Sequence, residues 1–188
     1  PPPVQEARFF TRSGLLTARK AGAWIDLDFP ATPPTPTPIP PELQGALGIT
    51  PHFIGMDQTG YLLCAVDSEA IVRNLKPDFS VLRQIPFCGI IVTAPADSSG
   101  DGNSGEVQGK RYDIVSRFFA PTMGIDEDPV TGSAHCTLAP FWRDRLQKDT
   151  LLAYQASHRG GVVRVHYDGG DRVTLGGQAI TVLRGELV

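Results

Sequence analysis

One segment of the sequence is predicted to be a helix whose first two turns are hydrophobic nearly all round, and such a helix limits how the rest of the chain can fold. The segment spans residues 132–147, and Pro140 near its middle is expected to kink or interrupt it. Its apolar residues fall at helical spacing, at Ala134, Leu138, Phe141, Trp142 and Leu146. The other residues of the first two turns are also small or apolar. We therefore predict that 132–147 is a central helix inside the protein.

The segments on both sides of this helix have strand patterns. Residues 24–29 alternate between two faces, and with two preceding strands they form a meander over 1–30. Residues 87–96, FCGIIVTAPA, are typical of a central buried strand. Four short strands are expected after the helix, the last in AITVLRGELV at 179–188. The sequence predicts an α+β fold with a mixed, mostly antiparallel, strongly curved sheet rolled around the helix.

Two short helices have clear end signals. PELQGALG at 41–48 begins with Pro41 and ends with Gly48, which favours a helix with a glycine C-cap. DSEAIVRNL at 67–75 opens with an Asp/Ser cap and Glu69 close behind.

A proline-rich stretch divides the chain. Seven of the twelve residues at 30–41 are proline, which favours an extended, polyproline-like conformation. We predict the terminal strands of a first unit at 1–30, a linker at 31–41 and a C-terminal half-barrel domain at 42–188. The linker is either a passive connector or a ligand for an SH3- or WW-type domain, and no flanking Arg or Lys supports the second alternative.

Composition argues against several classes of function. The chain has 188 residues, a net charge of −3 and no block of Lys or Arg, which argues against nucleic acid as a partner. No apolar stretch approaches the roughly 20 residues needed to cross a bilayer. The first residues, PPPVQEARFF, lack the features of a signal peptide. We predict a cytoplasmic protein that binds neither nucleic acid nor membranes.

The cysteines do not form a disulfide or metal pattern. Cys64, Cys88 and Cys136 are odd in number, widely spaced and set in apolar surroundings, so we expect free, buried thiols in a reducing compartment. Neither a CxxC pair nor a cluster of cysteine and histidine occurs in the sequence. We therefore expect no metal site.

An acidic cluster at 126–128 stands directly before the central helix. The start of a helix presents unpaired N–H groups and partial positive charge, which favours carboxylates and bound anions. Gly132 leaves the backbone open and a hydroxyl residue stands on either side of it, which is the composition of an anion-binding turn. Pro129 restricts Asp128 to extended backbone, and a carboxylate there suits acid-base chemistry. The acids either take part in such chemistry or only stabilise the helix dipole.

Residues 117–142, RFFAPTMGIDEDPVTGSAHCTLAPFW, strongly resemble the signature of the PhzF-like (phenazine biosynthesis-like) proteins, which are relatives of diaminopimelate epimerase. The similarity continues through IDLDFPA, NLKPDFSVL, YQASHRGG and RVTLGGQAITVLRGEL and covers nearly the whole chain. A core this distinctive is far more specific than a lone glycine pattern.

The resemblance implies a diaminopimelate-epimerase-like fold of two pseudo-symmetric halves, with the active site in the cleft between them. It implies an isomerase or epimerase-related enzyme that moves protons on a small anionic, often amino-acid-like substrate without a cofactor. By motif, the family's acidic residue falls on Asp128, and its substrate-contacting glycine and serine fall on Gly132 and Ser133. We predict Asp128 as the catalytic residue, and as substrate-binding residues Thr131, Gly132, Ser133 and His135.

One part of the family pattern is absent from the sequence. The family's first half carries an acid/base glutamate in a motif like E-x-N-x-S-E-T and a G-H-A-T turn, and neither occurs here. Residues 8–30 resemble the last strands of that half. The chain is therefore either part of a longer PhzF-like isomerase or an inactive, truncated homologue that acts as a binding or scaffold module. Open strand edges favour self-association, and a homodimer is expected.

Several residues near the motif have alternative roles. His135 is either a base or a packed, hydrogen-bonded histidine. Cys136 is expected to be a buried, inert thiol rather than a base, because Asp128 occupies the acidic place in the motif. Arg159 in HRGG is expected to be exposed at a hairpin turn rather than to bind substrate. The other two acids, Asp126 and Glu127, are expected to cap and orient the turn.

Overall fold

The computed structural model describes residues 6–11, 14–97, 106–107 and 109–186. Within them, eleven strands form one sheet in the order β1-β2-β3-β13-β12-β11-β10-β7-β6-β5-β4. These strands are β1 (Glu6–Thr11), β2 (Gly14–Ala21), β3 (Trp24–Pro30), β4 (Thr35–Pro36), β5 (Phe53–Met56), β6 (Tyr61–Ala65), β7 (Gly89–Pro95), β10 (Ile114–Phe119), β11 (Thr150–Gln155), β12 (Gly161–His166) and β13 (Arg172–Gly177). The pairs β6–β7 and β10–β11 are parallel, and the other neighbouring pairs are antiparallel. The mixed, mostly antiparallel sheet is as predicted.

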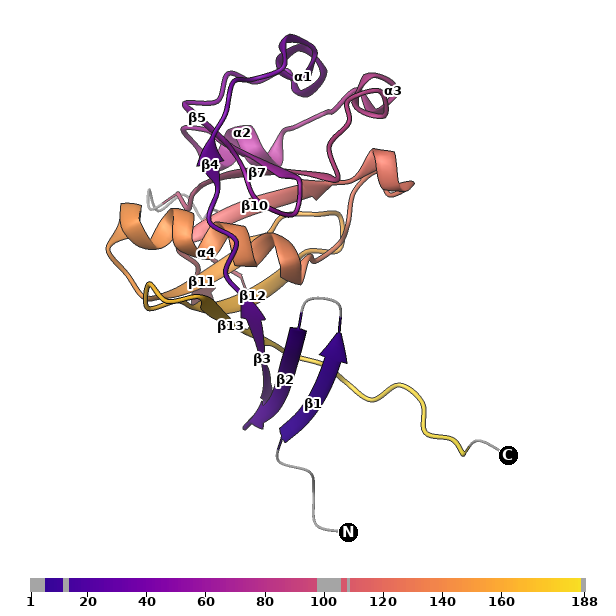
Figure 1. Ribbon diagram of the computed structural model, residues 1–188, viewed down its shortest axis with the longest axis vertical. Helices are drawn as coiled ribbons and strands as arrows, with labels where there is room; N and C mark the ends of the chain where they lie inside the picture. Colours follow the sequence, from indigo (N-terminus) through magenta and orange to yellow (C-terminus); the bar gives the residue numbers. More distant parts are fainter. Residues whose placement is uncertain (1–5, 12–13, 98–105, 108, 187–188) are drawn as a thin grey trace.

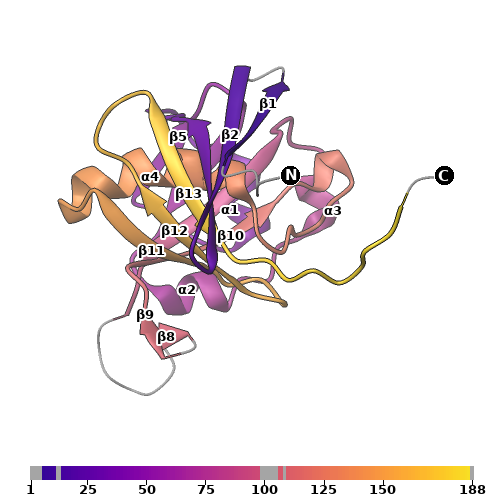
Figure 2. The same ribbon diagram turned by 90° about the horizontal axis from the view of Figure 1, so that it is seen from below.

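Helices cover both faces of this sheet (Figure 1). Helix α4 (Gly132–Leu146) packs on one face, and on the other lie α1 (Pro41–Leu47), α2 (Glu69–Arg73) and α3 (Phe79–Leu82). A short 3-10 helix, η1 (Pro121–Met123), precedes α4, and β8 (Glu106–Val107) pairs with β9 (Lys110–Arg111) in a separate hairpin that projects from the body of the fold (Figure 2). Every residue of α4 from Ala134 to Trp142 is buried, which confirms the predicted central helix.

Alternate residues of the central strands enter two different hydrophobic clusters. In β6, Leu63 packs with α4, whereas Leu62 packs with the outer helices. In β7, Ile91 and Ile90 divide in the same way, and the strand is buried from Gly89 to Ala94. The predicted central buried strand is therefore confirmed, and its side chains are predominantly apolar because both of its faces are covered.

The predicted signals at the ends of the short helices are also confirmed. Helix α1 ends at Gly48, whose φ of 64° is left-handed and whose N–H donates to the Gln44 carbonyl oxygen. Helix α2 begins after Ser68, whose Oγ accepts a hydrogen bond from the Ile71 N–H at 3.4 Å.

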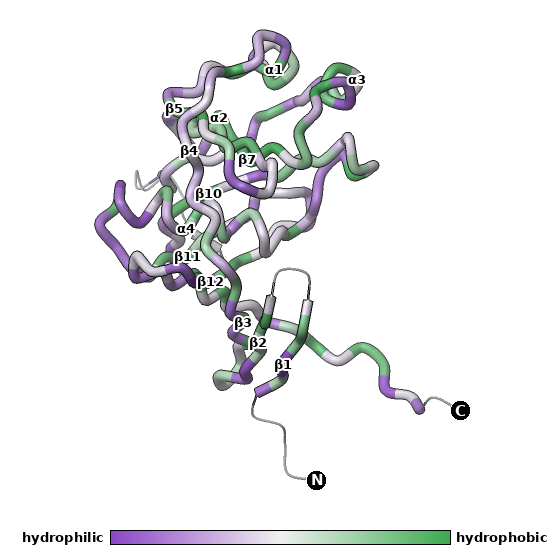
Figure 3. The backbone as a smooth tube through the Cα atoms, viewed as in Figure 1, coloured by the Kyte–Doolittle hydropathy of each residue, from purple (hydrophilic) through white to green (hydrophobic). Residues whose placement is uncertain are grey.

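The strand predicted at the C-terminal end is wrong for the part that the structure describes. Residues 178–186 form no strand and extend away from the sheet, as Figures 1 and 3 show. Their apolar side chains are exposed, with Ile180 at 87% and Leu183 at 85%. These residues cannot fold back along β13, because β13 already pairs with β12 over Thr174–Gly176 and with β3 along its whole length.

Two of the three cysteines are buried as predicted, and the third is not. Burial raises the pKa of Cys64 and of Cys136 to about 12, so both are inert thiols. Cys88 is exposed. Cys88 lies beside the turn at Gly60 and directly precedes β7, so it is outside the buried part of the strand.

Helix α4 passes through Pro140 without interruption, so of the two predicted effects of this proline the interruption is wrong. Proline has no N–H to donate to the carbonyl four residues earlier, which belongs to Cys136. The Thr32 N–H donates to that carbonyl oxygen at 3.1 Å. A residue of the proline-rich segment thereby replaces the missing helical hydrogen bond.

A buried chain of polar groups continues from this contact. The Thr32 hydroxyl lies 2.9 Å from the Thr137 hydroxyl, which donates to Asp57 Oδ2 at 2.5 Å. Asp57 Oδ1 accepts from the N–H groups of Thr59 and Tyr61 at 2.8 and 3.0 Å. Three segments, the proline-rich stretch, α4 and the β5–β6 turn, are joined by this network. The stretch predicted as a linker also adds β4 to the sheet edge.

We predict that Thr137→Val lowers the free energy of unfolding by about 1–3 kcal/mol, because Thr32 and Asp57 lose a buried hydrogen-bond partner. Thr137→Ser keeps the hydroxyl and removes only the methyl group, so it should cost less. Urea unfolding monitored by circular dichroism measures both. A larger loss in the serine variant would show that packing, not the hydrogen bonds, dominates at this position.

Candidate active site

The start of α4 lies at the surface, although the helix itself is buried. Gly132 and Ser133 are exposed, whereas Ala134 is the first of the buried residues. The N-cap residue Thr131 has extended backbone (φ −112°, ψ 102°), and no side chain in the described part of the chain caps this end. The first N–H groups of the helix are therefore open to a ligand at the surface.

Asp128 is held just before this helix start by three hydrogen bonds. Its N–H donates to the Phe118 carbonyl oxygen at 3.0 Å, and Gln155 Nε2 donates to the Asp128 carbonyl oxygen at 2.7 Å. The Thr131 hydroxyl donates to Asp128 Oδ2. Asp128 is half-buried. Asp128 and Thr131 thus lie together, next to the exposed Gly132 and Ser133.

Gln155 organises this loop, and the sequence reasoning missed it. The side chain is fully buried at the end of β11. Its Oε1 accepts from the Thr131 N–H at 2.8 Å, and its Nε2 also donates to the Thr131 hydroxyl at 3.1 Å. An available signal was the alternation of β11, in which Leu151, Ala153 and Gln155 share the buried face. An amide at a core position requires polar partners nearby.

Tyr61 is a second residue that sequence reasoning missed. Its hydroxyl lies 3.1 Å from the Ser133 Oγ. The ring packs edge-on against Phe118, with centroids 5.1 Å apart. Gly89 makes room for both rings, because a Cβ there would lie 2.4 Å from Phe118 Cζ and 3.1 Å from Tyr61 Cδ1. Tyr61 therefore adds a fixed hydroxyl to the helix start.

The other two acids do not cap the helix, so the capping part of that prediction is wrong. Asp126 forms an ion pair with Arg83 at 2.6 Å. Glu127 accepts two hydrogen bonds from Arg117, at 2.7 and 2.9 Å, and Arg117 also donates to the Leu75 carbonyl oxygen. The first turn of α4 contains no acid. The bidentate pair with Arg117 is stronger than a contact of Glu127 with the helix dipole would be.

His135 is packed inside the fold rather than exposed to a ligand. It is fully buried, and its Nδ1 lies 2.7 Å from the Thr131 carbonyl oxygen, to which it donates. Among the described residues, its Nε2 is the only buried side-chain nitrogen or oxygen without a hydrogen-bond partner. Burial lowers the pKa of His135 to about 4, so the ring is neutral at pH 7.

Neither a metal cluster nor a membrane-spanning helix was found in the described part of the chain. No group of three or more His, Cys, Asp or Glu residues there could hold a metal ion. None of the helices formed by these residues is both long and apolar enough to cross a membrane.

Comparison with known families gives a direct assignment. The family model PhzC-PhzF, described as phenazine biosynthesis-like protein, matches residues 41–185. The chain belongs to this family. The matched range includes Asp128, the start of α4 and Gln155, so the PhzF-like resemblance of the sequence is confirmed.

Curated members of the PhzC-PhzF family are similar along almost the whole chain. A protein named as an uncharacterized isomerase in Halalkalibacterium halodurans is 47% identical over 185 residues, which are 98% of this chain and 65% of that protein. Phenazine biosynthesis-like domain-containing protein 1 of Mus musculus is 35% identical, over 95% of this chain and 64% of its own length. The chain therefore spans less than two thirds of either relative.

Solved structures confirm the expected fold. A phenazine biosynthesis protein of the PhzF family from Enterococcus faecalis superposes with a TM-score of 0.83 and 36% identity, covering 99% of this chain and 66% of that one. A predicted epimerase from Pseudomonas aeruginosa, 15% identical over 98% of this chain and 67% of that one, has a TM-score of 0.65 and shares the fold.

Replacement of Gln155 by leucine should destabilise the protein by about 2–4 kcal/mol, because the Thr131 N–H and the Asp128 carbonyl are left buried without partners. Gln84→Leu is the control, since Gln84 is exposed and donates only to the Ser80 carbonyl at the surface. It should change stability by less than about 0.5 kcal/mol. Equal effects in urea unfolding would contradict the role of Gln155.

Stability should fall as the pH decreases below about 6.5, the pKa of an unfolded histidine. The pKa of folded His135 is about 4. Between these values the unfolded chain binds a proton that the folded chain does not, so folding loses up to about 3 kcal/mol. Unfolding free energies measured from pH 7 to pH 5 should decrease, and less so in His135→Gln. Parallel curves would contradict a neutral, buried His135.

Proposed function

We propose that this chain provides the Asp128 half of an isomerase site that moves a proton on a small, carboxylate-bearing, amino-acid-like substrate without a cofactor. The observation that carries the proposal is the open start of the buried helix α4, with Asp128 held beside it. Membership in the PhzC-PhzF family and the isomerase name of a relative support the reaction class.

The substrate carboxylate is assigned to the helix start. Gly132 and Ser133 are exposed there, and the Ser133 Oγ and the Tyr61 hydroxyl add two further polar groups. A carboxylate gains from the partial positive charge of the first helical turn and from its free N–H groups. A Cβ at Gly132 would meet only Leu175 Cδ1, at 3.8 Å. The fold itself has room for alanine at 132, so packing does not require glycine there. We therefore assign Gly132 to the close approach of a ligand to the backbone.

Asp128 is assigned the proton transfer. Its Oδ2 accepts from Thr131, and its backbone is fixed on both sides, by Phe118 and Gln155. Such fixation keeps a general acid or base within reach of one position on the substrate. Moving a proton from one face of a substrate to another also requires a second acid-base group opposite Asp128. In the family pattern that group is a glutamate of the other half.

His135 is assigned a supporting role in place of the predicted substrate contact. Its donation to the Thr131 carbonyl oxygen holds the N-cap, and its full burial keeps it from a ligand at the surface. Thr131 is likewise buried and positions Asp128. Direct substrate contacts are thereby reduced to Gly132, Ser133 and Asp128.

A homodimer in the cytoplasm completes the proposal. The side chain of Phe10 on the edge strand β1 is 89% exposed, and Figure 3 shows apolar positions in the exposed tail as well. Apolar surface along an open strand edge favours association.

Asp128→Asn should reduce proton exchange by about 100-fold or more, because an amide cannot transfer the proton. The measurement is deuterium incorporation into candidate amino acids in D₂O by the protein isolated from its native source, followed by mass spectrometry. Asp126→Asn is the matched control, since Asp126 pairs with Arg83 away from the helix start, and it should retain activity.

Two outcomes would count against the enzyme. Unchanged exchange in Asp128→Asn would remove this residue from the chemistry. A native protein that binds carboxylates at Gly132 and Ser133 but exchanges no proton would instead be the binding or scaffold module.

A further inference from the structure

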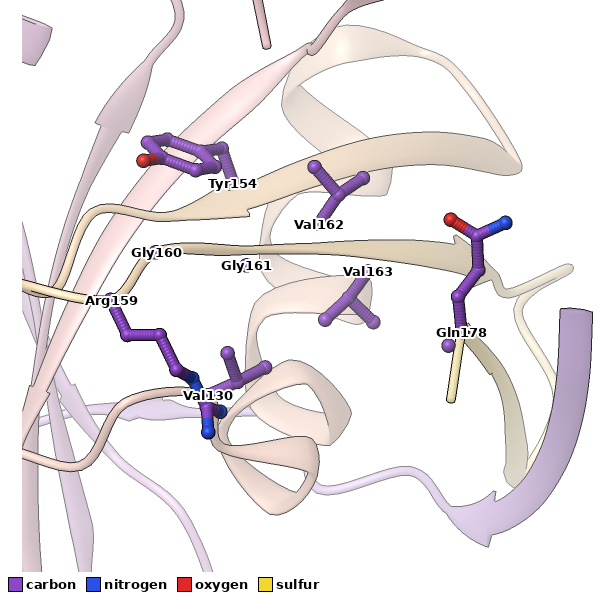
Figure 4. Close-up of a pocket in the computed structure, with 9 residues that line it drawn as sticks. Val130, Tyr154, Arg159, Gly160, Gly161, Val162, Val163 and Gln178 are labelled. Atoms are coloured by element: carbon purple, nitrogen blue, oxygen red, sulfur yellow. The ribbon is translucent and has the colours of Figure 1, made fainter. Parts of the chain in front are cut away.

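A hollow of about 470 Å³ is lined by Val130, which belongs to the loop that carries Asp128 (Figure 4). Its apolar wall includes Val130 and Val163, and its polar groups include Arg159 and Gln178. Val130 lies between Asp128 and Gly132 in the chain, so the hollow adjoins the proposed carboxylate site. It is not used by the function proposed above.

The hollow exists because two neighbouring strands separate. Strand β12 pairs with β13 only from Arg164↔Gly176 to His166↔Thr174. Strand β13 pairs with β3 along its whole length and ends at Gly177, which pairs with Ile25. The first half of β12, Gly161–Val163, therefore keeps its pairing with β11 but has no β13 partner. The space between this free edge and Gln178 is the hollow.

The turn that carries Arg159 is fastened to the Asp128 loop. The Ser157 hydroxyl donates to the Pro129 carbonyl oxygen at 2.7 Å, and the Gly160 N–H donates to the Ser157 Oγ at 3.1 Å. Gly160 has a φ of +70°. A Cβ on Gly161 would lie 2.2 Å from Val130 Cγ2, so this residue must be glycine for the turn to contact the loop.

Arg159 itself is a cation without a partner in the described structure. It is exposed, as predicted for the hairpin turn, and no hydrogen bond or ion pair joins it to another described residue. The arginines closest to the acidic cluster are engaged, Arg83 with Asp126 and Arg117 with Glu127. In Figure 4 the Arg159 side chain extends from the turn toward Val130. Its charge is thus directed at the wall shared with the proposed site.

We propose that Arg159 is a specificity-determining residue that binds a second anionic group of the substrate, whose first carboxylate lies at Gly132 and Ser133. The substrate class is then a dicarboxylate with an apolar chain between its two ends. A guanidinium binds a carboxylate with two parallel hydrogen bonds, and the Val130 and Val163 side chains accept methylene groups. This inference rests on the proposed function, since it needs the first carboxylate at the helix start.

The test is a titration of the isotope-labelled chain with pentanoate and with glutarate, which match in chain length, at constant ionic strength. The Gly132 and Ser133 amide signals and the Arg159 side-chain N–H signal are followed by NMR. Glutarate should bind about tenfold more tightly than pentanoate, because one charged hydrogen-bonded pair at a partly exposed site contributes about that factor to the dissociation constant. Only glutarate should shift the Arg159 signal. Arg159→Gln should remove the preference, and Arg159→Lys should keep part of it.

The matched control is Arg111→Gln, because Arg111 is an exposed arginine on the β8–β9 hairpin that projects from the fold (Figure 2). It should keep the preference for glutarate. Equal affinities of the two acids, or a preference that survives in Arg159→Gln, would overturn this inference and leave the carboxylate site standing. If neither acid shifts the Gly132 and Ser133 signals, the proposed function fails first and this inference fails with it.

Discussion

The burial of α4 is the constraint on which the rest of this structure depends. The part of the helix from Ala134 to Trp142 is buried all round and must be enclosed, and the curved sheet supplies the enclosing face. The few polar groups that enter with the helix must then find partners. Trp142 Nε1 donates to Thr93 Oγ1 at 3.0 Å, and the Cys136 carbonyl freed by Pro140 accepts from Thr32. Side chains and backbone from distant segments thereby become part of one core.

The same constraint decides where a ligand can bind. A buried helix reaches the surface only at its ends, and at the N-terminal end of α4 the exposed residues are Gly132 and Ser133. The loop before them cannot rely on solvent for its polar groups, because Gln155 and Thr131 are buried. Their mutual hydrogen bonds satisfy these groups and fix Asp128 at the same time. Stability of the loop and position of the candidate acid therefore have a common cause.

The site also depends on how the sheet divides around the helix. Strand β13 stays paired with β3 along its whole length but with β12 only over Thr174–Gly176, and a hollow opens at the unpaired part of β12, next to the Asp128 loop. The β11–β12 turn closes the other side of that hollow through the contact of Ser157 with Pro129. Arg159 is consequently placed by the topology of the sheet and by close glycine packing. The two anion-binding positions that we propose lie on neighbouring elements because of this geometry.

Local patterns in the sequence determined the central helix, the buried strand β7, the glycine end of α1 and the candidate acid Asp128 with its open helix start. These features depend on hydrophobic spacing, on backbone preferences of Gly and Pro and on motif residues, all of which act over a few positions. Only the tertiary structure decided the partners of Asp126 and Glu127, the role of Gln155 and the absence of a last strand. Each depends on contacts between different elements of the fold, which arise only when the sheet has closed on α4.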